Sequence, residues 1–294
     1  MKFENFQKKL YEKKLEIREY FPVAFETLKV FTNENKLWVI FFVIANIWKL
    51  FSGIVESKID DYKFLIFIPN VIATIYIGIF YIVSIIKIGK RIENKISRYN
   101  LKDIIKKYLI TIVMLVIMYL VITEIIFKII NSFQVAIFGI WWMGSQIWVS
   151  LHLSYELFLL IFGIVIITLA LVIFSAIIFL ISNIFYFVQI YCIRNIPIQE
   201  AFKLNLKLLE GNRLRILIPV IPLVVLNLIL TSPFSNIAIL DTLSFLKFLP
   251  IYAVFPISII IGTISSLLII FIIAINVIIY LNVEYDYIKK YNKK

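Results

Sequence analysis

The stretch FLIFIPNVIATIYIGIFYIVSII, residues 64–86, decides the fold class because it contains no charged residue over 23 positions. As a helix that rises about 1.5 Å per residue, it is long enough to cross the roughly 30 Å hydrocarbon core of a bilayer. The whole composition agrees, since 62% of the 294 residues are hydrophobic, against about 45–50% in soluble domains. The sequence therefore predicts an all-α integral membrane protein.

Five more apolar runs surround this stretch. The fourth run is over-long, because no charge occurs from Leu157 to Tyr191, and its excess must tilt or emerge into the interface. We predict six transmembrane helices joined to cytoplasmic interfacial amphipathic helices, in three parts: a leader at 1–36, a membrane domain at 37–288 and a basic tail at 289–294. The six predicted spans are 37–55, 64–86, 109–128, 157–182, 214–231 and 251–281.

The basic residues predict the orientation. In the six-span topology, 25 of the 30 Lys and Arg residues fall on one side, in the leader, two loops and the tail. The positive-inside rule places that side, and both termini, in the cytoplasm. We thus expect a multi-pass protein of a bacterial inner or plasma membrane. The net charge of +12 follows from this topology, so we expect anionic lipid headgroups as its partner, and no nucleic acid. Membrane proteins or a second copy are further candidate partners.

A repeated pattern precedes two of the spans. AFKLNLKLLEGNRLRI begins at Ala201, and AFETLKVFTNENKLWV begins at Ala24. In the first, we expect Asn195 to cap, Pro197 to enter the first turn and Gly211 to stop a helix over 197–210. A charged stripe on a wide apolar face is typical of a helix lying in the membrane interface. The residues of this predicted elbow are Phe202, Lys203, Lys207, Gly211, Asn212, Arg213 and Arg215.

The other copies are less regular. Residues 22–36 precede the first span, and 100–108 form a degenerate version before the third. Their matching orientation implies parallel internal repeats. The leader adds a basic amphipathic helix with Phe3, Phe6, Leu10 and Ile17 on one side. We expect the arginines that follow the elbow to sit at the headgroup level.

Polar residues within the spans are candidates for function. Glu124 and Lys128 lie one helical turn apart. They form either an ion or proton site or, as the favoured interpretation, a pair that neutralises its charges at the outer headgroup boundary. Lys49 is expected to extend toward the interface. Amides need partners, so we expect them to face the interior, where they are the candidates for lining a path. These amides are Asn46, Asn70, Asn183, Gln189, Asn227 and Asn276.

Two further patterns concern packing. Small residues recur at multiples of four in the last span, at Ser258, Gly262 and Ser266. They let a neighbouring helix approach closely, within one molecule by preference or at a homo-oligomer seam. The tryptophan-rich stretch 134–149 is either a re-entrant loop or, by preference, an outer interfacial helix.

The sequence offers little for chemistry. The chain has one Cys, Cys192, and one His, His152, too few ligands for a zinc site. The acidic loop with Glu56, Asp60 and Asp61 lacks calcium-loop spacing, and a solvated loop is the favoured interpretation. No phosphate loop, nucleophile elbow or nucleotide fingerprint is present. We therefore expect no cofactor, no metal and no enzymatic activity.

Two stretches resemble a known family. EAFKLNLKLLEGNRLRILIPVIPLV (200–224) and IIYLNVEYDYIKK (278–290) are similar to the glycerophosphoryl diester phosphodiesterase membrane-domain family. The resemblance implies a six-span bundle whose last helix runs into a Tyr-acidic-basic tail, here Tyr285, Asp286, Lys289 and Lys290. In fused relatives, the phosphodiesterase chemistry belongs to a separate soluble barrel with two histidines. The single His here implies a stand-alone membrane domain.

These patterns predict a non-catalytic polytopic membrane protein, an accessory, scaffold or lipid-contacting module. The alternative is a small transporter or permease subunit, which inverted repeats, broken helices or a continuous polar path would favour. Pro219, Pro222 and Pro256 are the breaks that we identify in the spans. An intramembrane enzyme lacks a credible catalytic group.

Overall fold

The computed structural model describes residues 3–58, 63–95, 100–151, 156–157, 160–168, 171, 186–234 and 250–291. Every regular element within these ranges is a helix, so the all-α prediction is confirmed for this part of the chain. The chain divides into two compact units: one combines Met1–Tyr108 with Tyr186–Lys294, and the other is Leu109–Phe185.

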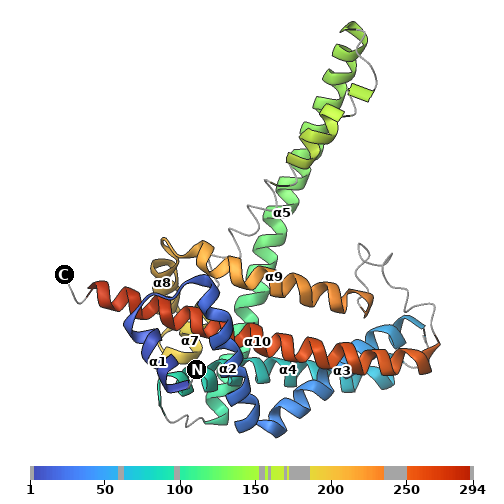
Figure 1. Ribbon diagram of the computed structural model, residues 1–294. Coiled ribbons are helices and arrows are strands. Elements are labelled where there is room, and N and C mark those ends of the chain that lie inside the picture. The colour runs from blue at the N-terminus through green and yellow to red at the C-terminus, as the bar shows by residue number, and fades with distance from the viewer. Residues whose placement is uncertain are drawn as a thin grey trace. The chain divides into compact units, whose positions relative to one another are not determined.

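The first unit begins with the leader and ends with the longest helix of that unit. The leader folds into two helices separated by a 3₁₀ turn, and the apolar runs follow as long helices (Figure 1). The helices of this unit are α1 (Phe3–Glu12), α2 (Tyr20–Glu34), α3 (Lys36–Lys58), α4 (Lys63–Ile92), α7 (Phe187–Arg194), α8 (Ile198–Leu209), α9 (Arg213–Thr231) and α10 (Ile251–Tyr291), with 3₁₀ turns η1 (Ile17–Glu19) and η2 (Ser232–Phe234).

Four of these helices carry segments long and apolar enough to cross a membrane. The segments are Lys36–Val55, Ile66–Ile92, Arg213–Phe234 and Tyr252–Lys290. They coincide with four of the predicted spans, so these four helices have the length and composition that crossing a membrane requires. The predicted span at 109–128 lies within another helix, α5, and that at 157–182 lies mostly outside the described residues. The count of six spans stays a prediction.

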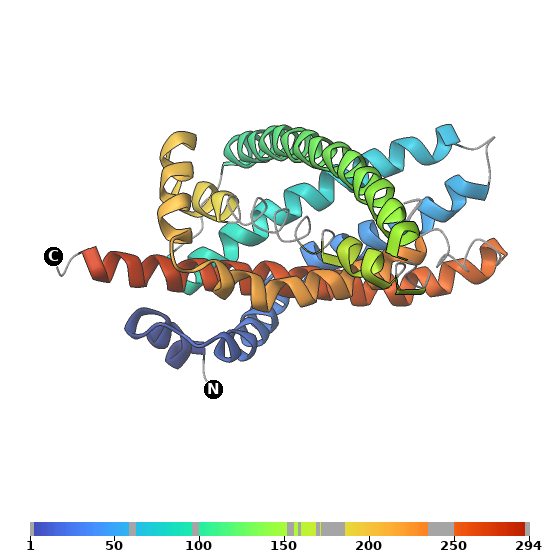
Figure 2. The same cartoon turned by 90° about the horizontal axis from the view of Figure 1, so that it is seen from above.

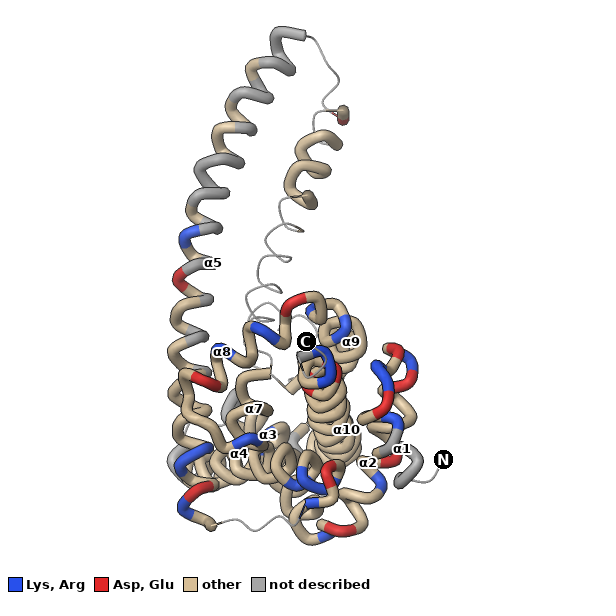
Figure 3. Tube along the Cα trace, turned by 90° about the vertical axis from the view of Figure 1, so that its left-hand side faces the viewer, with Lys and Arg blue, Asp and Glu red and all other residues tan. Residues whose placement is uncertain are grey.

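Helix α10 is the centre of the first unit. It packs against α2, α3, α4 and α9, which run alongside it (Figure 1, Figure 2). Every residue from Ile273 to Glu284 is buried, and a helix that is apolar and covered all round belongs to a core. Figure 3 looks onto the end where α10 finishes, and Lys and Arg positions are frequent there along α1, α8 and the end of α10.

Most of the second unit is made by α5 (Leu101–Leu151), which starts in the first unit. Residues 134–149, predicted as a re-entrant loop or a separate interfacial helix, are instead a continuous part of α5. No proline interrupts Leu101–Leu151, so the backbone hydrogen bonding can continue. The ring of Trp141 packs edge-on against Phe162, with 5.0 Å between the ring centroids.

The leader differs in one respect from prediction. Helix α1 ends at Glu12, and Ile17 lies in the separate turn η1. A single amphipathic helix with Ile17 on its apolar side was therefore wrong. The second copy of the repeated pattern does form a helix, α2, directly before α3.

Candidate functional site

The polar side chains within the spans bond to one another across helices. The Asn46 amide of α3 donates to the Gly262 carbonyl at 3.2 Å and to the Ser265 and Ser266 hydroxyls of α10 at 3.4 and 3.0 Å. The Ser265 hydroxyl donates to Asn227 Oδ1 of α9 at 2.8 Å. One polar network thus ties three membrane-spanning helices together. Hydrogen bonds of this kind hold helices together where lipid offers no partner.

A second interhelical bond joins α3 to α4. The Ser52 hydroxyl donates to Asn70 Oδ1 at 2.6 Å. Close packing accompanies these bonds, because an added Cβ at Gly262 would lie 3.0 Å from the Ile47 Cα of α3. Ser258 is fully buried on α10, and its hydroxyl returns to the Val254 carbonyl at 2.9 Å. The small residues of the last span therefore lie at or near the place where α3 and α10 approach.

The remaining intramembrane candidates do not join these networks. Asn276 and Gln189 are buried, and the side-chain oxygen of each has no hydrogen-bond partner. Lys49 lies in α3, where its carbonyl accepts a bond from Ser52. Four predicted residues lie outside the described part of the chain: Asp60, Asp61, His152 and Asn183.

In the second unit, Glu124 and Lys128 form the expected pair, with 3.4 Å between carboxylate and ammonium. Both side chains are more than half exposed, so the pair contributes little to stability. Glu56, of the predicted acidic loop, lies near the end of α3 in the first unit.

The elbow is a helix, as predicted, but its boundaries are made differently. Asn195 adopts the left-handed conformation (φ 54°) and ends α7, and Pro197 precedes the first turn of α8. Our assignment of Asn195 as the N-cap of the elbow and of Pro197 to its first turn was wrong. Gly211 has φ +72°, which suits a helix stop that glycine adopts without strain.

Helix α8 exposes both charged and apolar side chains, and it buries one polar side chain. Lys203 and Lys207 are exposed, but so are Phe202 and Leu206. The polar Asn205 is fully buried, and its side-chain oxygen accepts a hydrogen bond from the Tyr186 amide at 3.0 Å. The sequence analysis assigned no role to Asn205, and a bond to a residue outside its own helix leaves no local pattern that could have revealed it.

Three more elbow residues lie at the entry to α9. The Asn212 amide donates to the Leu208 carbonyl at 3.0 Å, which closes the turn. Arg213 begins α9. Arg215 donates from its guanidinium to the Leu15 carbonyl, and its guanidinium lies 5.8 Å from the Tyr20 ring centroid. Arg215 thus contacts the leader. The sequence analysis predicted only that this residue lies at the headgroup level.

A charged cluster at the end of α7 is the most elaborate polar feature of the first unit. Arg194 Nη1 lies 2.6 Å from Glu93 Oε1, and Arg194 Nε donates to the two Glu284 oxygens at 2.8 and 3.0 Å. The Tyr280 hydroxyl donates to Glu284 at 2.9 Å, and Lys95 lies 2.9 Å from Glu93. Both carboxylate side chains are only 5% exposed. Sequence analysis assigned no role to any of these five residues.

Electrostatics keep this cluster charged. Burial alone would raise the pKa of Glu93, but the hydrogen bond from Lys95 and the charge of Arg194 outweigh it and lower that pKa. Burial alone would lower the pKa of Arg194, but the bonds and charge of Glu284 raise it. The cluster is therefore a set of paired ions that joins the ends of α4, α7 and α10.

Asn282 connects α10 to the leader with every hydrogen-bonding group it has. Its amide nitrogen donates to the carbonyls of Leu10 and Lys13 at 3.1 and 3.0 Å. Its oxygen accepts from the Leu15 amide and the Tyr20 hydroxyl, both at 3.0 Å. An asparagine has two donors and two acceptor sites, and all four are used here. Asn282 thus fixes the turn between α1 and η1.

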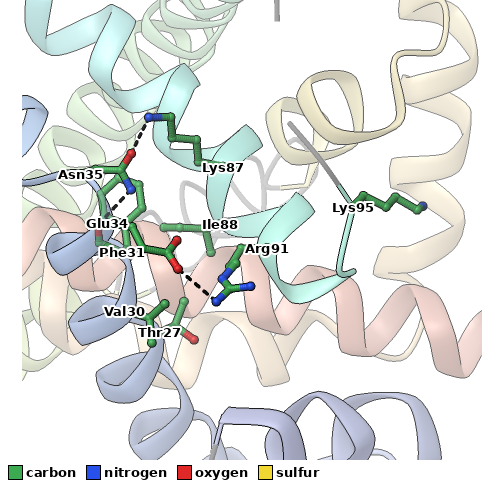
Figure 4. Close-up of a pocket in the computed structure, with 9 residues that line it drawn as sticks. All are labelled: Thr27, Val30, Phe31, Glu34, Asn35, Lys87, Ile88, Arg91 and Lys95. Atoms are coloured by element: carbon green, nitrogen blue, oxygen red, sulfur yellow. Dashed lines mark hydrogen bonds and ion pairs between the residues drawn. The ribbon is translucent and has the colours of Figure 1, made fainter. Parts of the chain in front are cut away.

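A basic cavity of about 230 Å³ lies between α2 and the end of α4 (Figure 4). Arg91 pairs with Glu34 at 3.0 Å, and the Lys87 ammonium donates to Asn35 Oδ1. Figure 4 shows two neighbouring pairs, with Lys87 directed at Asn35 and Arg91 directed at Glu34, while Lys95 points away from them. The cavity is lined by Thr27, Val30, Phe31, Glu34, Asn35, Lys87, Ile88, Arg91 and Lys95.

Three further cavities lie in the first unit. One is formed by α1 and the end of α10, one by η1 and the start of α9, and one by α4, α5 and α7. All four cavities have at least two Lys or Arg residues in their walls, and none of the four is lined by Asn46, Asn70, Asn227 or Asn276. Among the described residues, no three His, Cys, Asp or Glu side chains gather to hold a metal ion.

Comparisons with known proteins do not add a family. No protein-family model, no curated protein and no solved structure matches this chain. The resemblance to the glycerophosphoryl diester phosphodiesterase membrane domain stays a prediction.

Proposed function

We propose that this protein is a non-catalytic, multi-pass membrane module that contacts anionic lipids and acts as an accessory or scaffold component. The observation that supports this proposal best is that polar side chains inside the spans bond other helices, whereas those at the helix ends line cavities. Inside the spans, Asn46, Asn70 and Asn227 are engaged in bonds between helices. The cavities instead have basic walls, built largely from the leader, the helix ends and the segments between helices. Polar groups used in this way hold a bundle together and leave the basic end available for headgroups.

The outer faces of the spans suit contact with lipid chains. Large apolar side chains of α3 and α4 are strongly exposed, among them Leu37 (71%), Phe41 (57%) and Ile72 (62%). Exposed apolar surface on this scale needs a cover. In a membrane protein the acyl chains supply it.

A small transporter is the alternative. Four prolines lie inside the helices that carry candidate spans, Pro219 and Pro222 in α9, Pro256 in α10 and Pro69 in α4, and our sequence analysis left out Pro69. Prolines of this kind are found in transporter helices. A transport path also needs polar groups that are available to a substrate, and the three bonded asparagines are already used between helices. The accessory module is therefore the better supported reading.

The lipid contact is tested by reconstituting the purified protein into nanodiscs of phosphatidylcholine, with or without phosphatidylglycerol. A ligand that binds only the folded state raises stability by mass action. We expect a higher unfolding temperature with phosphatidylglycerol, at low and at moderate ionic strength. Equal unfolding temperatures in both lipids would contradict the proposed function.

The proposed orientation puts both termini in the cytoplasm. Reporter fusions after Lys107 and after Lys294 should then read cytoplasmic, and fusions after Lys63 and Lys247 external. An external C-terminus would exclude the six-span topology.

The absence of catalysis is tested with glycerophosphodiesters, which the purified chain should not hydrolyse with or without divalent metal. Turnover that disappears on His152→Ala would overturn the non-catalytic assignment.

A further inference from the structure

We propose that the cavity between α2 and the end of α4 binds the phosphodiester group of an anionic phospholipid. This inference rests on the proposed lipid-contacting function and names the place and chemistry of the contact. Its central groups are the side chains of Lys87, Arg91, Asn35 and Glu34 (Figure 4).

The charges of the cavity fit one phosphodiester. Of the three cations in the wall, Lys95 is paired with Glu93. Lys87 and Arg91 supply two positive charges and Glu34 one negative charge, which leaves one positive charge for a ligand with one negative charge. Arg91 and Glu34 are each about half exposed, at 50% and 47% of the side chain, so both can meet a headgroup that enters from the solvent side. Guanidinium and ammonium groups form the strongest hydrogen bonds with phosphate oxygens.

Aromatic side chains next to the cavity place it at headgroup depth. The Lys87 ammonium lies 5.7 Å from the ring centroid of Trp38. The Trp38 ring stacks on Tyr76 at 5.8 Å, and the Tyr76 hydroxyl donates to the Trp38 carbonyl at 3.1 Å. Trp and Tyr are enriched where the hydrocarbon core meets the headgroups. Of the two rings, Trp38 lies near the start of α3, and it is this residue that supports a position of the cavity at headgroup depth.

The surface beside the cavity suits the rest of a phospholipid. Leu37 and Phe41 on α3 are exposed, and the Phe41 ring meets Tyr76 edge-on at 6.5 Å. Acyl chains can lie along this apolar face while the phosphate stays at Lys87 and Arg91. A free phosphate ion would use only the charged part of the site.

A buried hydroxyl adds to the polar wall. Thr27 lines the same cavity, is 2% exposed, and its Oγ1 has no hydrogen-bond partner in the described structure. A buried polar group without a partner costs free energy. A polar ligand in the cavity would give the Thr27 hydroxyl a hydrogen-bond partner.

Glu34 opposes the ligand. Its carboxylate lies 3.0 Å from the Arg91 guanidinium. Its negative charge repels a phosphate group that approaches Arg91. Removing its charge should therefore increase the affinity for an anionic headgroup, whereas removing the charge of Arg91 should decrease it. A misfolded variant can lose affinity but does not gain it, so the opposite signs separate binding from folding.

The experiment titrates phosphatidylglycerol into phosphatidylcholine nanodiscs and follows the unfolding temperature and the lipids retained in native mass spectrometry. Arg91→Gln should weaken phosphatidylglycerol binding about fivefold, and Glu34→Gln should strengthen it about fivefold, from one unit charge at close range in water. The control is Lys102→Gln, which removes an exposed charge at the start of α5 that lines none of the four cavities. Its affinity should stay within about twofold of the wild type.

The outcomes separate the two proposals. If wild type prefers phosphatidylglycerol but Arg91→Gln, Glu34→Gln and Lys102→Gln all bind alike, the site is overturned and the lipid-contacting function stands. If wild type shows no preference, the function falls as well. A parallel titration with inorganic phosphate in phosphatidylcholine nanodiscs should show no stabilisation. A phosphate response that follows the same variants would keep the anion site and overturn its assignment to a lipid.

Discussion

The charged cluster of α7 makes a quantitative prediction. Replacing Arg194 with methionine leaves the carboxylates of Glu93 and Glu284 without their shared cation, although both are only 5% exposed. Arg194 itself is 21% exposed, so the loss is that of a largely buried pair. Breaking such a pair by removing one partner costs about 3–5 kcal/mol. We expect Arg194→Met to lose about this much free energy of unfolding.

A second substitution should restore part of the loss. Glu284→Gln removes one of the stranded charges and keeps an oxygen to accept the Tyr280 hydrogen bond. Glu93 still has Lys95 at 2.9 Å. The double variant Arg194→Met/Glu284→Gln should therefore be more stable than the sum of the two single changes implies, with a coupling of about 2 kcal/mol or more. Arg194→Lys should remain destabilised, because one ammonium cannot reproduce the forked contacts.

The assay is unfolding of the purified protein in detergent micelles by added SDS, followed by circular dichroism. The reasoning is refuted if Arg194→Met costs less than about 1 kcal/mol, the value typical of an exposed pair. It is also refuted if the single changes add within about 0.5 kcal/mol, since independent sites behave in that way.

Three more predictions follow from the same structure. Gly262→Ala should cost about 1–3 kcal/mol in the same assay, because the new Cβ would lie 3.0 Å from the Ile47 Cα, while Gly139→Ala, with open space around it, should cost nothing. Because the pKa of Glu93 is lowered in the folded state, its contribution to stability is present above the unfolded pKa and is lost as the pH falls through the folded pKa; Glu93→Gln should flatten the acid limb of a stability profile taken from about pH 6 to 3. Burial raises the pKa of the Cys192 thiol to about 12, so maleimide should label the native protein slowly at neutral pH and the SDS-unfolded protein completely. Rapid labelling of the native state would contradict that burial.

The spans were predictable because their signal is local. A run such as 64–86 or 251–281 needs no knowledge of its neighbours, since an apolar helix of that length is recognised from composition alone. The elbow helix could also be predicted, because Gly211 suits a stop wherever the chain goes next. The continuity of α5 through residues 134–149 could not be predicted from the tryptophans. Tryptophans indicate an interface, but they do not show whether a helix continues.

The polar contacts at the end of α10 were out of reach for a different reason. Glu93 and Glu284 reach the same guanidinium from positions far apart in sequence. A pattern of three or four residues detects neighbours on one helix, and it cannot detect a partner on another. Asn282 lies in the stretch that carries the family resemblance, yet its role depends wholly on where the leader turns. Asn46, Asn70 and Asn227 were identified because an amide within a span needs a partner, but which partner each of the three has came from the packing.

The bonds of Asn282 have a consequence for how the protein is made. The Leu15 amide and its acceptor on Asn282 are 267 residues apart. A ribosome that adds about 5–20 residues per second therefore needs roughly 15–50 seconds to produce the second partner after the first. The leader is synthesised first and docked last, and until then its backbone groups at Leu10, Lys13 and Leu15 rely on water. A nascent chain that stops before Asn282 leaves the leader open to proteases, however well its earlier helices have inserted.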